Sequence, residues 1–220
     1  MQTLVLIDGN SLLNRAYYAT GHLSTKDGTP TNAVFGFIKL LLKLVDTFSP
    51  DKLIVTFDLK APTFRHKMYE GYKATRKPMP DDLAVQVGTL KSLLASMHIA
   101  MCEKEGYEAD DLIGTLSHKF ADTKSIIVTG DRDSYQLVDA VTDVCFTKTG
   151  VSNLLHLTAE NFEQEVGYAP EQVIEMKALM GDSSDNIPGV AGVGEKTARM
   201  LIGQYGSVEN VYAHLGELNA

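Results

Sequence analysis

Short apolar runs alternate with longer helical patterns over the first two-thirds of the chain. The runs at residues 3–7, 53–57, 99–102 and 125–129 are rich in β-branched and aliphatic residues, which predicts β-strands. Residues 32–48 place apolar side chains at helical spacing, and Pro50 follows as a stop signal. Residues 81–98 and 109–120 show the same spacing. Strands that alternate with helices predict an α/β fold with a mostly parallel sheet covered by helices.

After residue 157 the pattern becomes helical throughout. Helical spacing covers residues 158–166, 170–180 and 195–204, and a glycine-rich turn separates the last two segments. A chain of 220 residues with 44% hydrophobic composition is long enough to bury a sizeable core. We therefore expect a catalytic core over residues 1–157 and a small helical subdomain over residues 158–220.

Acidic residues follow the predicted strands. Asp8 follows the first strand, Asp58 the second, and Asp131 with Asp133 the fourth. Three more acids, at 108, 110 and 111, begin the helical pattern after the third strand. In open parallel sheets, loops from the carboxyl ends of several strands meet at one edge and form the binding site. We therefore expect acids that are distant in the sequence to meet in space.

The distribution of charge changes the meaning of the acidic total. The formal net charge is −8, which by itself argues against a nucleic-acid partner. Nine acids belong to the short clusters, and without them the net charge would be +1. The chain therefore carries its acidic surplus in one candidate metal site, whose members are Asp8, Asp58, Glu108, Asp110, Asp111, Asp131, Asp133, Asp182 and Asp185.

Divalent cations explain why so many carboxylates would converge. Crowded carboxylates repel one another unless cations compensate them, and oxygen ligands without His or Cys favour Mg²⁺ or Mn²⁺ over zinc. Two such ions can activate water and stabilise the leaving oxygen of a phosphodiester. Any one acidic motif alone could equally oppose a helix dipole or cap a turn. Asp51, Asp139 and Asp143 lie outside the clusters and are expected to be solvated.

A basic segment follows Asp58. Residues 60–77 hold six Lys or Arg and one Glu, a local charge of +5, with aromatic residues at 64, 69 and 72 between them. Cations contact phosphates, and aromatic rings among them can stack on unpaired bases. The alternative is a solvated loop between two helices.

A glycine-rich turn at residues 187–194 precedes the last helical pattern. Glycines let the backbone approach a phosphate, and the next helix begins with unpaired N–H groups. The turn does not fit the P-loop spacing, because Glu195 precedes the Lys196-Thr197 pair. A packing joint between helices is the alternative to sequence-independent binding of duplex DNA.

Cellular location follows from cysteine usage and from apolar runs. The two cysteines, Cys102 and Cys145, lack partners at zinc spacing and suit a reduced cytoplasm. The first apolar run begins within the first few residues, which leaves no room for a secretory leader, and no run reaches the length of a membrane span. We expect a cytoplasmic protein without a membrane partner.

Six motifs carry a family resemblance that covers nearly the whole chain. They are LIDGNS (6–11), TFRH (63–66), YKATRKPMP (72–80), YEADDLIG (107–114), TGDRD (129–133) and MGDSSDNIPGV (180–190). In this order they closely resemble the 5′-nuclease family, and specifically the N-terminal nuclease domain of bacterial DNA polymerase I and its stand-alone relatives. The resemblance implies a PIN-like (resolvase-like) core, a helical arch at about 59–80, and a helix–three-turn–helix subdomain, here truncated.

The resemblance also implies roles for the acids. The first metal ion would be held by Asp8, Glu108 and Asp110, with Asp58 acting through water. The second would be held by Asp131, Asp133, Asp182 and Asp185, with Asp110 bridging both ions and Asp111 supporting the ligands.

Further roles implied by the resemblance concern DNA. In the arch, Arg65, Lys73 and Arg76 would steer the scissile phosphate, and Tyr72 would stack near it. Contacts to duplex DNA would come from Gly189, Gly192, Gly194, Lys196 and Lys77, with K⁺ as a further ligand of the hairpin carbonyls. The implied activity is two-metal hydrolysis at 5′ flaps, nicks and 5′ ends in replication and repair.

The implied protein is a monomer whose partners are branched, nicked or 5′-ended DNA and a linked or separate DNA polymerase. Two other functions stay open. A PIN-type ribonuclease would share the acidic sheet edge, but it has less reason for the glycine turn. A non-catalytic binder of branched DNA would gain from losing the mutual repulsion of nine acids.

Overall fold

A twisted sheet forms the centre of the molecule in the computed structural model, which describes residues 2–150 and 153–218. Its strands are β1 (Thr3–Asp8), β2 (Lys52–Thr56), β3 (Ala100–Cys102), β4 (Lys124–Thr129), β5 (Thr142–Thr149) and β6 (Asn153–Leu157), in the order β3-β2-β1-β4-β5-β6. All neighbouring pairs are parallel except β5 and β6. The strand order reverses between β1 and β4, which is where ligands bind in sheets of this kind.

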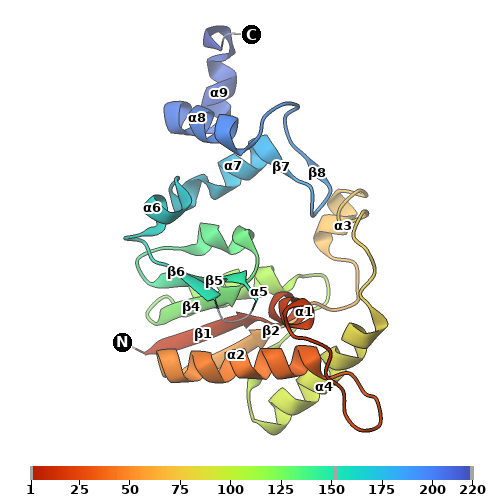
Figure 1. The fold of residues 1–220 in the computed structure, drawn as a ribbon. Helices are drawn as coiled ribbons and strands as arrows, with labels where there is room; N and C mark the ends of the chain where they lie inside the picture. The colour runs from red at the N-terminus through yellow and green to blue at the C-terminus, as the bar shows by residue number, and fades with distance from the viewer. Residues whose placement is uncertain (1, 151–152, 219–220) are drawn as a thin grey trace.

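Helices cover both faces of the sheet (Figure 1). One face packs against α1 (Gly9–Ala19), α2 (Asn32–Phe48) and α4 (Asp81–Ser96), and the other against α5 (Ala109–Lys119), η1 (Arg132–Leu137) and α6 (Phe162–Val166). Along β1, Val5 and Ile7 belong to the first core, and Leu4 and Leu6 to the second. A strand buried on both faces explains the continuous apolar run before Asp8.

A smaller helical unit follows the sheet. It contains η2 (Pro170–Gln172), α7 (Val173–Met180), α8 (Glu195–Tyr205), α9 (Val208–Ala213) and η3 (Leu215–Glu217), and α7, α8 and α9 share a third apolar core. Between α7 and α8, the short strands β7 (Gly181–Asp182) and β8 (Ile187–Pro188) form a hairpin that reaches the segment after α3 (Phe64–Met68) (Figure 1). There Asn186 donates a hydrogen bond to the Gly71 carbonyl (2.7 Å).

Most predicted elements are present, with several differences. The helix at 32–48 has the predicted bounds, but α1, β5 and β6 were not predicted. The helix expected at 158–166 covers only Phe162–Val166, and that expected at 170–180 begins as the 3-10 turn η2. The arch is helical only over Phe64–Met68, because Gly71, Pro78 and Pro80 disfavour a longer helix.

Strand β5 escaped prediction because polar side chains interrupt its pattern. Asp143, expected at the solvated surface, is buried in β5, where its carboxylate pairs with Lys124 (2.7 Å) and His156 (2.9 Å). The division after residue 157 stays a prediction, although Phe162 and Val173 pack into the same core as Leu157. In the described part of the chain, no helix is both long and apolar enough to cross a membrane.

Candidate active site

Asp8 is the first acid of the site and is fixed by local structure. It ends β1 and caps α1, where its Oδ1 accepts from the Ser11 amide (2.9 Å). Its Oδ2 accepts from the Thr129 hydroxyl (2.9 Å), which comes from the neighbouring strand β4. Only 4% of Asp8 is exposed, and this burial raises the pKa of Asp8 to about 6. The position after a central strand therefore delivers a carboxylate that resists ionisation without a cation.

The start of α5 supplies the next acids. Glu108 is its N-cap, and Asp110 lies in its first turn with a buried Oδ1 atom that has no hydrogen-bond partner. Burial raises the pKa of Asp110 well above its usual range, and the carboxylates of Asp8, Asp131 and nearby acids raise it further. A buried acceptor without a donor is costly, so this atom marks a place for a cation or an ordered water.

Asp58 and Asp111 already have protein donors. The Asp58 carboxylate accepts from the Ala109 amide (2.7 Å). Asp111 accepts both N–H groups of the Arg65 guanidinium (2.8 Å each) and the Glu108 amide (2.9 Å). Burial opposes ionisation of Asp111, but these donors outweigh it and hold the pKa of Asp111 below its usual range. Asp111 therefore joins the arch to α5.

A second group of acids lies where the core meets the hairpin. Carboxylate oxygens of Asp133, Asp182 and Asp185 lie within 4.8 Å of one another, a spacing that could hold a metal ion. Asp133 comes from η1, and the other two come from β7 and the turn after it. Asp131 interacts with both groups of acids, since its charge raises the pKa of Asp110 and of Asp133, and it caps η1 by accepting from the Asp133 amide (3.0 Å).

Two adjoining cavities unite the nine acids. One, the α7-side cavity, measures about 570 Å³ and extends between α5 and α7. The other, the α1-side cavity, measures about 920 Å³ and extends over α1, where Asn10, Asn14 and Tyr18 line it. Both cavities share Lys73, Glu108, Asp110 and Asp131, and each of the nine predicted acids lines one or both. All nine acids offer carboxylate oxygens as ligands, which fits hard divalent cations.

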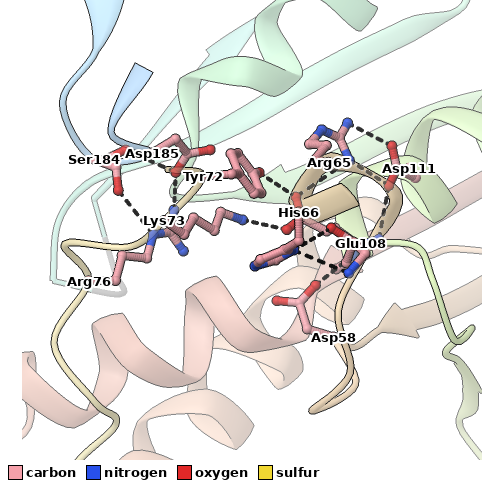
Figure 2. Close-up of polar contacts among 12 residues, drawn as sticks. Asp58, Arg65, His66, Tyr72, Lys73, Arg76, Glu108, Asp111, Ser184 and Asp185 are labelled. Atoms are coloured by element: carbon pink, nitrogen blue, oxygen red, sulfur yellow. Dashed lines mark hydrogen bonds and ion pairs between the residues drawn. The ribbon is translucent and has the colours of Figure 1, made fainter. Parts of the chain in front are cut away.

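Side chains of the arch point toward the acids of the site (Figure 2). The Lys73 ammonium pairs with Glu108 Oε1 (2.7 Å), and the Tyr72 hydroxyl donates to Glu108 Oε2 (2.8 Å). Arg76 reaches Asp185 Oδ1 (2.5 Å) and the Ser184 carbonyl (3.1 Å). Tyr72 is only 5% exposed, so its ring is not free to stack on a base in this structure. The sequence did not reveal the burial of Tyr72, because its partner Glu108 is 36 residues away.

The hairpin glycines differ in what they require. A side chain at Gly189 would meet the backbone of Met180 at 2.2 Å, so close chain packing alone explains that glycine. Gly192 has a φ of +79° with open space around it, and Gly194 caps α8 in open space. Lys196 and Lys77 are exposed, and neither lines the two cavities. Positive φ explains the glycine at 192 by the conformation of the turn, and the open space around it leaves room for another molecule.

Comparison with known proteins agrees with this geometry. Residues 3–167 match the sequence model "5′-3′ exonuclease, N-terminal resolvase-like domain", and residues 168–220 match "5′-3′ exonuclease, C-terminal SAM fold". The chain belongs to the 5′-3′ exonuclease family. It is 41% identical to the 5′-3′ exonuclease of Bacillus subtilis over 98% of this chain and 74% of that protein.

Other members of the 5′-3′ exonuclease family are much longer than this chain. It is 43% identical to DNA polymerase I of Caldicellulosiruptor bescii over 99% of this chain, but it spans only 26% of that protein. A similar fold occurs in the bacteriophage T5 D15 flap endonuclease, solved as a pseudo-enzyme-product complex with DNA and metal ions. That structure gives a TM-score of 0.78 at 22% identity, over 100% of this chain and 80% of the T5 chain.

Sequence reasoning missed two basic residues of this family member. Lys177 of α7 forms ion pairs with both Asp133 and Asp182 (2.5 Å for the latter). Arg15 of α1 lines the α1-side cavity and donates to the carbonyls of Lys148 (3.0 Å) and Gly130 (3.4 Å). Neither lies in the basic segment, and a single Lys or Arg on a helix carries no signal of its own.

Proposed function

We propose that this chain is a structure-selective 5′-nuclease that hydrolyses phosphodiester bonds of DNA at 5′ flaps, nicks and 5′ ends. The observation that carries the proposal is the convergence of nine acids on two adjoining cavities, with an unpartnered Asp110 oxygen between them. Family membership makes nuclease chemistry the natural use of such a cluster. We further propose a role in replication and repair, including removal of Okazaki primers, at the bacterial nucleoid.

The acids fit two divalent cations, for which we propose Mg²⁺ or Mn²⁺. Asp8, Glu108 and Asp110 would hold the first, with Asp58 supporting it through water. Asp131, Asp133, Asp182 and Asp185 would hold the second. When bound, such ions supply the positive charge that activates water and stabilises the leaving oxygen. Asp111 would hold Arg65 and the arch in place rather than bind an ion, because its oxygens already accept three N–H groups.

The basic arch residues would position the reacting strand. Lys73 pairs with Glu108, and Arg76 pairs with Asp185. Because the metal ions would bind these two carboxylates, ion binding would free both basic side chains to contact a phosphate. Duplex DNA would contact the turn at Gly192 and Gly194 and the start of α8 with Lys196, with K⁺ as a candidate ligand of the hairpin carbonyls. We also propose a DNA polymerase, linked or separate, as a partner, since DNA polymerase I relatives share this segment.

The proposal is tested by cleavage of a 5′-flap DNA and of a single-stranded RNA with Mg²⁺. Asp110→Asn keeps the shape of the side chain but removes the charge at the shared position, so flap cleavage should fall by about 10²-fold or more. Asp46→Asn, an exposed acid of α2 outside the cluster, serves as the matched control and should cleave like the wild type. Preferred cleavage of the RNA would favour the ribonuclease alternative. Cleavage of the flap by Asp110→Asn at the wild-type rate would refute the assignment of the site.

A further inference from the structure

Lys177 sits inside the second group of acids. It lies near the end of α7, and its ammonium contacts Asp133 of η1 and Asp182 of β7. Carboxylate oxygens of these two acids and of Asp185 lie within 4.8 Å of one another. The Lys177 ammonium therefore stands among the oxygens that a second divalent ion would need.

The two groups of acids differ in how they are compensated. In the first group, Glu108 pairs with Lys73 (2.7 Å) and Arg65 (3.5 Å), but among the described residues no basic side chain forms an ion pair with Asp8 or Asp110. In the second group, each of the three acids has a basic partner, because Lys177 pairs with two of them and Arg76 with Asp185. A divalent ion at the first group meets two acids, Asp8 and Asp110, without a basic partner, whereas one at the second must replace positive charges at Asp133, Asp182 and Asp185.

We propose that Lys177 is a built-in counter-cation that occupies the second half of the cluster and must be displaced before a divalent ion binds there. The inference rests on the proposed function, since it concerns filling of the same metal site. It makes the two halves unequal, so that the first fills at low metal concentration and the second only at higher concentration. Lys177 thereby sets the metal concentration at which the site becomes complete.

The surroundings of Lys177 allow this displacement. About a third of its side chain is exposed, and it lines the α7-side cavity of about 570 Å³. A flexible lysine stem can therefore rotate into the cavity with its charge hydrated.

The test is direct binding of Mn²⁺ to the metal-free protein without DNA, with free Mn²⁺ followed by electron paramagnetic resonance. Wild type should bind one ion tightly and a second more weakly. Lys177→Met should tighten the second ion by about tenfold or more, because the competing charge is gone, and leave the first within about threefold. Lys177→Arg keeps the charge and should not tighten it. Lys177→Gln replaces the methionine variant if circular dichroism shows that the latter does not fold.

Lys124→Met is the matched control, because Lys124, at the start of β4 and far from Asp131, also pairs with a buried aspartate, Asp143 of β5. It should leave both Mn²⁺ affinities unchanged. A second ion that binds Lys177→Met no more tightly than wild type overturns the inference, and so does loss of that ion. If wild type binds no Mn²⁺, the proposed function fails as well. If it binds two ions and cleaves flap DNA while the variant shows no tightening, the counter-cation inference alone fails.

Discussion

Lys73 is held in an unusual backbone conformation at the centre of the site. Its φ is +55°, which is uncommon for a residue with a side chain, and its amide donates to the Asp185 carbonyl (2.9 Å). Its ammonium pairs with Glu108 and lies 4.9 Å from the centre of the Tyr72 ring. A strained residue tied to both groups of acids is typical of a functional site, where surrounding contacts fix a costly conformation.

At the residue scale, we expect Lys73→Ala to slow the reaction far more than it weakens binding. A cation aimed at the reacting phosphate acts mainly in the transition state, so the single-turnover rate should fall by about 10²-fold and flap affinity by less than about fivefold. Lys67→Ala is the control, because Lys67 lies in the same basic segment but is exposed and lines neither cavity. Equal losses of rate and affinity in Lys73→Ala would demote this lysine to a simple phosphate contact.

At the scale of elements, the β7–β8 hairpin links the helical subdomain to the arch. Asn186 donates to the Gly71 carbonyl, and Arg76 of the arch reaches Asp185 of the turn. These contacts hold the turn that carries Asp185 beside the arch segment (Figure 1). The turn that continues toward α8 is free of such contacts at Gly192, where a side chain would meet nothing within 4 Å.

Gly192→Val tests whether this turn binds duplex DNA. The variant forces a β-branched residue into positive φ and places its side chain where we propose that the backbone approaches a phosphate. Affinity for a nicked duplex should fall by about tenfold or more, whereas affinity for a single-stranded 5′ end should change little.

Gly206→Val is the matched control for Gly192→Val. Gly206 also has a positive φ (+83°) and open space, but it lies at the end of α8. Both variants should lose a similar amount of stability, about 1–3 kcal/mol, in denaturant unfolding. If Gly192→Val binds the nicked duplex as well as Gly206→Val does, the turn is only a packing joint.

At the scale of the whole molecule, the acid cluster opposes the stability of the metal-free fold. Burial raises the pKa of Asp8 to about 6, and it raises the pKa of Asp110 and of Asp133 in the same direction. Such acids must ionise at a place that disfavours charge. The three apolar cores have to supply the free energy that this requires, and bound cations remove the requirement.

We therefore expect acid to stabilise the metal-free protein. The ordinary pKa of Asp8 is 3.8, so as pH rises from 3.8 toward 6 the unfolded chain ionises before the folded one, and stability falls. Acidification from pH 7 to pH 5 should then add about 1 kcal/mol from Asp8 alone, or about 2–4 °C in the melting temperature.

Melting with EDTA and with excess Mg²⁺ at both pH values measures this effect. Mg²⁺ should raise the melting temperature at pH 7 and abolish the gain on acidification, because a bound cation keeps the acids ionised in the folded state. Asp143 does not affect this comparison. His156 and Lys124 lower its pKa against the effect of burial, so its contribution to folding stability is lost only as pH falls below its ordinary pKa of 3.8. A metal-free protein that melts at a lower temperature at pH 5 than at pH 7 would contradict the prediction.

The sequence by itself determined the helix at 32–48, the central strands and the convergence of the acids. These follow from local patterns. A continuous apolar run predicts a buried strand, and an acid directly at its end, such as Asp8 or Asp131, is then expected at the carboxyl edge of the sheet. The family resemblance rested on the same motifs.

Only the tertiary structure decided which side chains face the acids. Tyr72 is buried against Glu108, Lys177 enters the second group of acids, and Asp143 becomes a buried partner of Lys124. Strand β5 was not predicted for the same reason, because Asp143 and Thr147 find their partners on β4 and β6. Such pairings join residues far apart in the chain, and their free energy depends on burial that no local pattern contains.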